Sequence, residues 1–150
     1  MTLDRRTLLT GATAFVALAL VPIPLAADTL DPEVEEALAA ILDGREAEEE
    51  GITIEVPNVA ENGAQVPITV HVDSPMTADD HVNAIHIVAT QNPTPGIGTF
   101  HLTPKIGRAE VATRIRLAEG QEVRVLAELS DGRVLGAAAQ IAVTLGGCAT

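Results

Sequence analysis

Cys148 is the residue of this chain whose type and position point most clearly to chemistry. It is the only cysteine among 150 residues, and it follows Gly146 and Gly147 in the terminal sequence VTLGGCAT. Glycine leaves the backbone almost unrestricted, so residues 146–150 are expected to form a flexible C-terminal tail. An extended tail places the thiol about 10 Å beyond the last strand. We therefore interpret Gly146 and Gly147 as a flexible arm for the cysteine.

The C-terminal tail contains nothing that would activate the thiol. A thiol reacts as the thiolate, which is a minority species at neutral pH unless a cation, a metal or a helix N-terminus lowers its pKa. Residues 146–150 include no Lys, Arg or His. Activation is then expected from a site in another protein that receives the tail. The pattern favours a substrate-carrying cysteine over a catalytic one.

The other residues that could do chemistry form no recognisable group. The histidines lie in or beside different predicted strands and are expected to face solvent; they are His71, His81, His86 and His101. Asp79 and Asp80 are interpreted as part of a charged loop. GxSxG, HExxH and glycine-rich phosphate-binding patterns are absent from the sequence. We expect no catalytic residue, no metal ligand and no cofactor in this chain.

The N-terminal residues 1–27 resemble an export signal. Arg5 and Arg6 precede an apolar stretch over residues 8–21, and small residues end at Ala27. The paired arginines favour the twin-arginine route, with ordinary secretion as the alternative, and predict a periplasmic protein. A single cysteine in an exported domain indicates either an intermolecular disulfide or a reactive thiol.

Composition limits the classes of partner. The formal net charge is −12, which argues against nucleic acid and membrane surfaces as partners. With no Trp or Tyr and two Phe, the core must consist of Val, Ile, Leu and Ala.

Residues 28–51 predict one helix followed by an acidic connection. Asp31 suits the N-cap, Pro32 the first turn and Gly44 the helix end. An apolar face formed by Val34, Leu38, Ile41 and Leu42 is expected to pack against the body of the protein or against a partner. The charged sequence REAEEEG that follows is interpreted as a solvated connection.

Residues 52–145 show the two-residue period of half-buried strands. Seven strands are predicted, over residues 52–56, 65–73, 82–90, 99–103, 110–117, 122–129 and 133–145. Pro67 inside the second strand predicts an edge position or a bulge. The number of short strands and turns predicts an all-β, immunoglobulin-like antiparallel β-sandwich with one N-terminal helix and a flexible C-terminal tail.

The sequence resembles the SoxY family, the sulfur-carrier subunits of the periplasmic thiosulfate-oxidising system. The resemblance rests on VTLGGCAT together with AENGAQVPITVHVD, NPTPGIGTFHLTP and EVATRIRLAEGQEVRVLAELSDG. It implies that Cys148 carries sulfur intermediates covalently and that Gly146 and Gly147 match the glycines before the carrier cysteine. It also implies a heterodimer with a SoxZ-like subunit, and service to haem-containing, hydrolase and dehydrogenase enzymes of the system.

One feature departs from the family pattern. The common ending is Gly-Gly-Cys-Gly-Gly, whereas this chain has Ala149 and Thr150 after the cysteine. Two alternatives therefore stay open: a paralogous carrier that serves another sulfur enzyme, and an exported interaction module that uses Cys148 for an intermolecular disulfide.

Overall fold

The structure is a computed structural model that describes residues 30–146. The predicted export signal, Gly147 and Cys148 lie outside the described residues. Helix α1 (Pro32–Leu42) comes first and is followed by strands β1 to β9. The strands are β1 (Ala47–Glu48), β2 (Ile52–Glu55), β3 (Val59–Asn62), β4 (Val66–Val72), β5 (Val82–Ala89), β6 (Gly96–His101), β7 (Ala109–Ile115), β8 (Gln121–Leu129) and β9 (Val134–Leu145).

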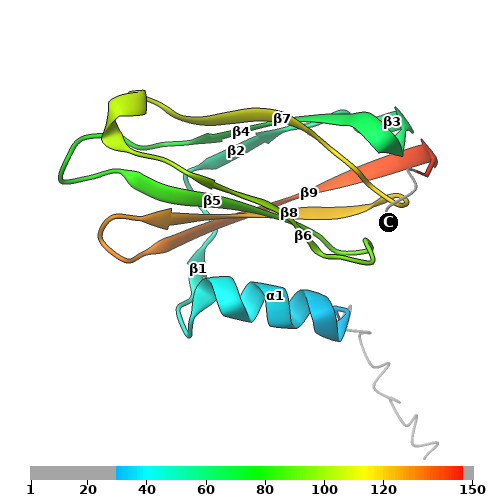
Figure 1. The fold of residues 1–150 in the computed structure, drawn as a ribbon, viewed down its shortest axis with the longest axis horizontal. Coiled ribbons are helices and arrows are strands. Elements are labelled where there is room, and N and C mark those ends of the chain that lie inside the picture. Colours follow the sequence, from blue (N-terminus) through cyan, green and yellow to red (C-terminus); the bar gives the residue numbers. More distant parts are fainter. Residues whose placement is uncertain (1–29, 147–150) are drawn as a thin grey trace, which may run out of the picture.

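The strands form two sheets packed face to face (Figure 1). The larger sheet has the order β1-β9-β8-β5-β6, with β3 also paired to β9, and the smaller has the order β2-β4-β7. This architecture confirms the predicted β-sandwich with one N-terminal helix. Two pairings were not predicted from the sequence. Strands β1 and β3 both pair with β9, and both run parallel to it.

The core is aliphatic, as the composition requires. Alternate residues of β4 and β8 face the interior, and Val66, Val70, Val123 and Val125 are fully buried there. Their burial removes apolar surface from water, which is the main stabilising term for such a sandwich. The fully buried residues of this core are aliphatic, and Phe100, which is partly buried, packs against them.

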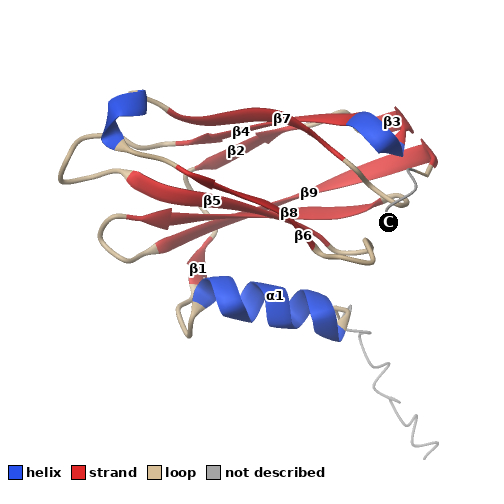
Figure 2. Cartoon of the chain, viewed as in Figure 1, coloured by secondary structure: helices blue, strands red, loops and turns tan. Residues whose placement is uncertain are grey.

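Helix α1 covers the outer face of the larger sheet (Figure 2). Asp31 caps its start by accepting a hydrogen bond from the Glu33 backbone N–H at 3.0 Å. Val34 and Leu38 are buried against the sheet in a second apolar cluster with Val88, Leu126 and Val134. The apolar face of the helix thus packs on its own sandwich, which settles the choice between sandwich and partner. No helix within residues 30–146 is long and apolar enough to cross a membrane.

Two local expectations need correction. The acidic connection contains β1, whose Ala47 and Glu48 pair with the start of β9, so it is not simply a solvated loop. Pro67 lies on the central strand of the smaller sheet rather than on an edge strand, and the β4 register shows no bulge. The proline is tolerated because β2 pairs with β4 only as far as Thr69, which leaves Pro67 without a neighbour on that side.

Candidate functional site

Strand β9 carries the C-terminal tail and extends past the sheet that contains it. Its pairing with β8 ends at Ile141, and its last residues pair instead with β3, where Ala142 lies opposite Val59 and Leu145 opposite Asn62. The chain is therefore held by strand pairing up to Leu145. The C-terminal tail begins at a fixed point at one end of the sandwich.

Gly146 is placed against the turn that joins β7 to β8. A Cβ built on Gly146 would overlap the backbone carbonyl oxygen of Ala118, so no larger residue fits without movement of one of the two segments. In the same turn, a Cβ on Gly120 would lie 3.3 Å from the backbone nitrogen of Val143. The glycine at 146 thus permits a close backbone contact as well as the flexibility predicted from sequence.

A buried polar network fixes this end of the sandwich. Thr90 and Gln121 are the only buried polar residues within the described part of the chain. The Gln121 side chain accepts a hydrogen bond from the Gln91 backbone N–H at 2.7 Å and donates one to Asn92 Oδ1 at 2.9 Å. Asn92 Oδ1 also accepts from the Ala118 backbone N–H at 2.9 Å. Satisfied buried networks of this kind rigidify their surroundings.

We call the surface formed by residues 90–95, 116–121 and 143–146 the tail-bearing end of the sandwich. A groove of about 340 Å³ adjoins it, between the loop that follows β5 and strand β7. We call it the arginine groove, and its lining residues are Asn92, Pro93, Thr94, Gly96, Ile97, Arg114 and Arg116. Both arginine side chains are exposed there.

The histidines are spread over the molecule, as the sequence predicted, but they do not all face solvent. His101 is exposed, and His81 Nδ1 lies 3.0 Å from the Thr77 carbonyl oxygen. His71 is half-buried, with Nδ1 lacking a hydrogen-bond partner and Glu110 3.9 Å away. Within residues 30–146, no three His, Cys, Asp or Glu side chains are grouped so as to hold a metal ion.

His86 takes part in a polar link between the larger sheet and the end of helix α1. Its Nε2 lies 2.7 Å from Glu128 Oε1, and Arg45 donates to Glu128 Oε2 at 3.2 Å. The Arg45 side chain also donates to the carbonyl oxygens of Leu42 and Ile41 at the helix end, and the Arg45 backbone N–H donates to Leu42 as well. Burial raises the pKa of Glu128, but the hydrogen bonds from His86 and Arg45 outweigh it and leave that pKa below its usual value.

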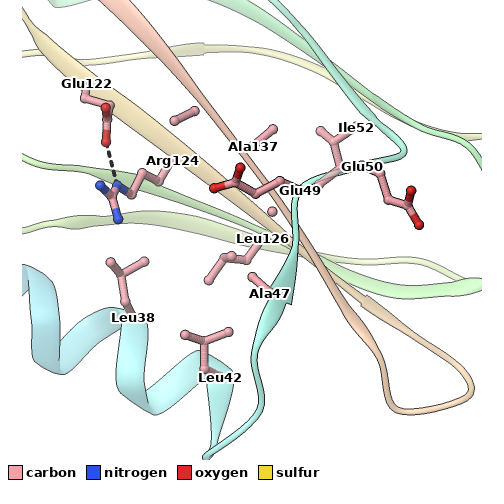
Figure 3. Close-up of a pocket in the computed structure, with 12 residues that line it drawn as sticks. Leu38, Leu42, Ala47, Glu49, Glu50, Ile52, Glu122, Arg124, Leu126 and Ala137 are labelled. Carbon is pink, nitrogen blue, oxygen red and sulfur yellow. Dashed lines mark hydrogen bonds and ion pairs between the residues drawn. The ribbon is translucent and has the colours of Figure 1, made fainter.

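Another groove, with a volume of about 530 Å³, lies between α1 and the outer face of β8 and β9 (Figure 3). Leu38 and Leu42 of the helix face Leu126 and Ala47 across it, and Glu122 pairs with Arg124 at 2.5 Å. The small residues of β9, Gly136, Ala137 and Ala138, leave this space beneath the helix. Gly146, the predicted site residue that the structure describes, does not line it.

Sequence reasoning missed the residues that build the tail-bearing end. Asn92 lies in the loop after β5 and Gln121 begins β8, and only the folded chain brings them together. Arg114 and Arg116 could be read as charges on the solvent face of a strand, which gives no sign of the groove beside them. Gly147 and Cys148 lie outside the described residues, so their assignment rests on the sequence and on the comparisons that follow.

The solved structures include a protein with the same fold and recognisable sequence similarity. It is the sulfur carrier protein SoxY from Chlorobium limicola, with 29% identity over 75% of this chain and 97% of that chain, and a TM-score of 0.63. A superoxide reductase (neelaredoxin) from Ignicoccus hospitalis matches at 18% identity over 65% of this chain and 82% of that chain, with a TM-score of 0.56. A putative superoxide reductase from Thermotoga maritima matches at 20% identity over 64% of this chain and 87% of that chain, with a TM-score of 0.53. The two reductase matches show a shared fold only.

A search of curated proteins found no match. The family model for the sulfur oxidation protein SoxY matches residues 38–148, which include the end of α1 from Leu38, the whole sandwich and Cys148. This match and the Chlorobium limicola structure confirm the resemblance seen in the sequence motifs. The chain belongs to the SoxY family of sulfur oxidation proteins.

Proposed function

We propose that this protein is a covalent carrier of sulfur intermediates, with Cys148 as the substrate-carrying residue. The observation that carries the proposal is that the family match runs through Cys148, the only thiol in the chain. The similar structure from Chlorobium limicola is itself that of a sulfur carrier protein. The chain supplies the attachment point, and partner enzymes supply the catalysis.

The carrier chemistry consists of steps at a single sulfur atom. A haem enzyme joins thiosulfate to the Cys148 sulfur: the thiol S–H bond breaks with release of its proton, an S–S bond forms, and two electrons pass to the haem enzyme. A hydrolase then uses water to release sulfate and leaves a persulfide on the cysteine. Where a sulfur dehydrogenase is present, it oxidises the remaining sulfane sulfur. Each step needs the thiol to reach a different active site.

The described structure supports a rigid body up to the start of the C-terminal tail. Strand β9 is paired up to Leu145, and the buried network around Gln121 fixes the turn against which Gly146 lies. A rigid base reduces the conformational freedom lost when the C-terminal tail enters a partner. The body therefore presents Cys148 from a defined position.

A SoxZ-like subunit is the proposed stable partner. Among the described residues, Val59 and Leu145 are large apolar side chains that are 58% and 68% exposed, and both belong to the β3–β9 pair. Val59 is paired with Ala142 and Leu145 with Asn62, three residues further on, so the two side chains point to opposite faces of the pair and do not form one patch. The proposal of a SoxZ-like partner therefore rests on membership of the SoxY family. Coexpression with such a subunit should give a heterodimer in size-exclusion chromatography. Elution of this chain as a separate monomer at micromolar concentration would show that this assignment is wrong.

Periplasmic localisation is proposed from the predicted export signal. Arg5 and Arg6 precede a modestly apolar stretch, the order found in twin-arginine signals, which direct folded proteins out of the cytoplasm. Replacement of both arginines by lysine should leave the precursor in the cytoplasm. Undiminished export of that variant would favour the ordinary secretory route.

The ending Ala149-Thr150 favours a second candidate, a paralogous carrier for another sulfur enzyme. Both residues have a Cβ, and Thr150 is β-branched, so this ending is stiffer than Gly-Gly. A partner tunnel shaped for Gly-Gly would accept it less well. Replacing both residues with glycine should raise the loading rate with the thiosulfate enzyme if this explanation holds.

Substitution of Cys148 tests the proposed function. With the reconstituted partner enzymes, Cys148→Ser should abolish thiosulfate-dependent electron transfer, whereas folding and partner binding should match the wild type, because a terminal residue contributes almost nothing to the core. Thiosulfate-dependent electron transfer at the wild-type rate in the Cys148→Ser protein would rule out the carrier role of this thiol.

A further inference from the structure

The short distance between the sandwich and Cys148 means that a receiving enzyme must contact the tail-bearing end. This inference rests on the proposed function, in which Cys148 enters partner active sites. Gly146 lies against Ala118, and from its Cα the chain can extend only about 7 Å to the Cα of Cys148. An active site that admits the thiol therefore brings its rim against the protein surface around Gly146.

The arginine groove lies at this surface. Arg116 is two residues before Ala118, the residue that Gly146 contacts, and Arg114 is two residues earlier still. Side chains two residues apart in an extended chain point to the same side, so the two guanidinium groups lie about 7 Å apart along the strand direction. The groove is therefore the cationic part of the surface that a receiving enzyme meets.

Arg114 and Arg116 differ from the other arginines of residues 30–146 in having no carboxylate within 4.0 Å in that range. The other four arginines are each paired: Arg45 with Glu128 at 3.2 Å, Arg108 with Glu110 at 3.1 Å, Arg124 with Glu122 at 2.5 Å and Arg133 with Asp131 at 2.8 Å. The chain has 21 acidic residues and a net charge of −12, so possible partners within the chain are plentiful. Two neighbouring arginines that have no carboxylate partner among residues 30–146 are thus available to an external anion.

The walls of the groove are already ordered. Asn92 donates a hydrogen bond to the Arg116 carbonyl oxygen at 2.8 Å and accepts one from the Ala118 N–H at 2.9 Å. The Ala89 backbone N–H donates to the Pro95 carbonyl oxygen at 2.8 Å, which closes the loop that carries Asn92. A preorganised surface loses little conformational entropy on binding.

We propose that the arginine groove docks a carboxylate-bearing rim around the active site of the enzymes that receive Cys148. A guanidinium group binds a carboxylate with two parallel hydrogen bonds, so two such pairs fix an orientation as well as a contact. The rest of the protein is strongly acidic and repels an acidic surface in other orientations. The groove therefore directs the tail-bearing end toward the active-site entrance.

A simpler explanation makes a different prediction. Charged side chains on an edge strand prevent unwanted pairing with other strands, and β7 is the last strand of the smaller sheet. In that case, loss of Arg114 and Arg116 would affect aggregation but leave sulfur transfer unchanged. The rate of transfer therefore distinguishes the two explanations.

The test compares two double variants with the same change in net charge. Arg114→Gln with Arg116→Gln removes the groove cations, and Arg108→Gln with Arg133→Gln removes two arginines that already have carboxylate partners. Each full-length carrier, with its partner subunit, is loaded with thiosulfate by the haem enzyme of the same organism. We expect the groove variant to lower kcat/KM for carrier loading about tenfold at low ionic strength, mainly through KM, and less at high salt. In the control variant, kcat/KM for carrier loading should change by less than about twofold.

Cross-linking identifies the groups that meet the groove. A carbodiimide joins an amine to a contacting carboxylate, so Arg116→Lys should give an isopeptide bond between position 116 and an Asp or Glu of the haem enzyme, whereas Arg108→Lys should not. Equal loading rates for the two double variants, or a cross-link at position 108 and none at 116, would overturn the docking proposal. Neither result bears on whether Cys148 carries sulfur, because the Cys148→Ser variant tests that role separately.

Discussion

Gly146 lies against the backbone carbonyl of Ala118 so closely that a Cβ on residue 146 would overlap that oxygen. This contact joins the end of β9 to the turn between β7 and β8. The contact gives a second reason for glycine at the start of the C-terminal tail, besides the flexibility predicted from sequence: a larger residue would not fit against Ala118. The base of the tail is thus a packed junction.

Gly146→Ala should therefore loosen the end of β9. The added methyl group forces Leu145 away from Asn62 or displaces the turn, at a cost of about 1–3 kcal/mol in the free energy of unfolding. Urea titration measures this cost, and hydrogen exchange should quicken at residues 143–145. Gly96→Ala is the control, because nothing lies within 4 Å of a Cβ at that position. Equal stability of the two variants would show that the contact with Ala118 is not restrictive.

The buried network should stabilise the tail-bearing end. Gln121→Met keeps the side-chain length but leaves the Gln91 N–H without its acceptor, and it should cost about 1–3 kcal/mol in the free energy of unfolding. Gln140→Met, on an exposed part of β9, should change that free energy by less than about 0.5 kcal/mol. Exchange of the Ala118 N–H, which donates to Asn92, should accelerate only in the first variant. An unchanged exchange rate of the Ala118 N–H in Gln121→Met would show that Gln121 does not keep the tail-bearing end rigid.

Helix α1 should depend on its buried leucine for docking. Leu38→Ala removes a side chain that is 9% exposed, in a cluster with Leu126 and Val134, and should lower the free energy of unfolding by about 2–3 kcal/mol. Ile106→Ala provides the comparison, since Ile106 is 53% exposed and should be nearly neutral. Both values come from urea unfolding curves. A cost below about 0.5 kcal/mol for Leu38→Ala would mean that the helix does not stay on the sheet in solution.

The contacts of Glu128 with His86 and Arg45 should make the free energy of unfolding depend on pH. The pKa of Glu128 in the folded protein is below its usual value of 4.5, so the folded state favours the carboxylate. The stabilisation is present above that usual value and is lost as the pH falls through the lower folded pKa. The difference in unfolding free energy between wild type and Glu128→Gln should therefore shrink as the pH is lowered below 4.5. A difference that grows on acidification would contradict this reasoning.

Local chemistry explains which parts of the fold could be predicted. The start of α1 follows from Asp31 and Pro32, and most strands follow from alternating aliphatic residues, because these signals act within a few residues. Strands β1 and β3 were missed because both are short and pair in parallel with β9, far along the chain. Their existence depends on a partner strand that local sequence does not reveal.

The candidate site divides in the same way. Cys148 and its preceding glycines are recognisable from the sequence because a single thiol beside Gly146 and Gly147 has a direct chemical meaning. The arginine groove is not, because it requires β7 to lie beside the loop that carries Asn92. The contact of Gly146 with Ala118 likewise depends on two segments that meet only in the folded protein.

The most direct test of the carrier role is mass spectrometry of the protein purified from cells that oxidise thiosulfate. We expect the C-terminal peptide with Cys148 to carry thiosulfonate or persulfide groups, and Cys148→Ser protein from the same cells to carry none. Cys148 found only in disulfide-linked peptides, with no sulfur-containing adduct under turnover conditions, would contradict the account and favour an interaction module.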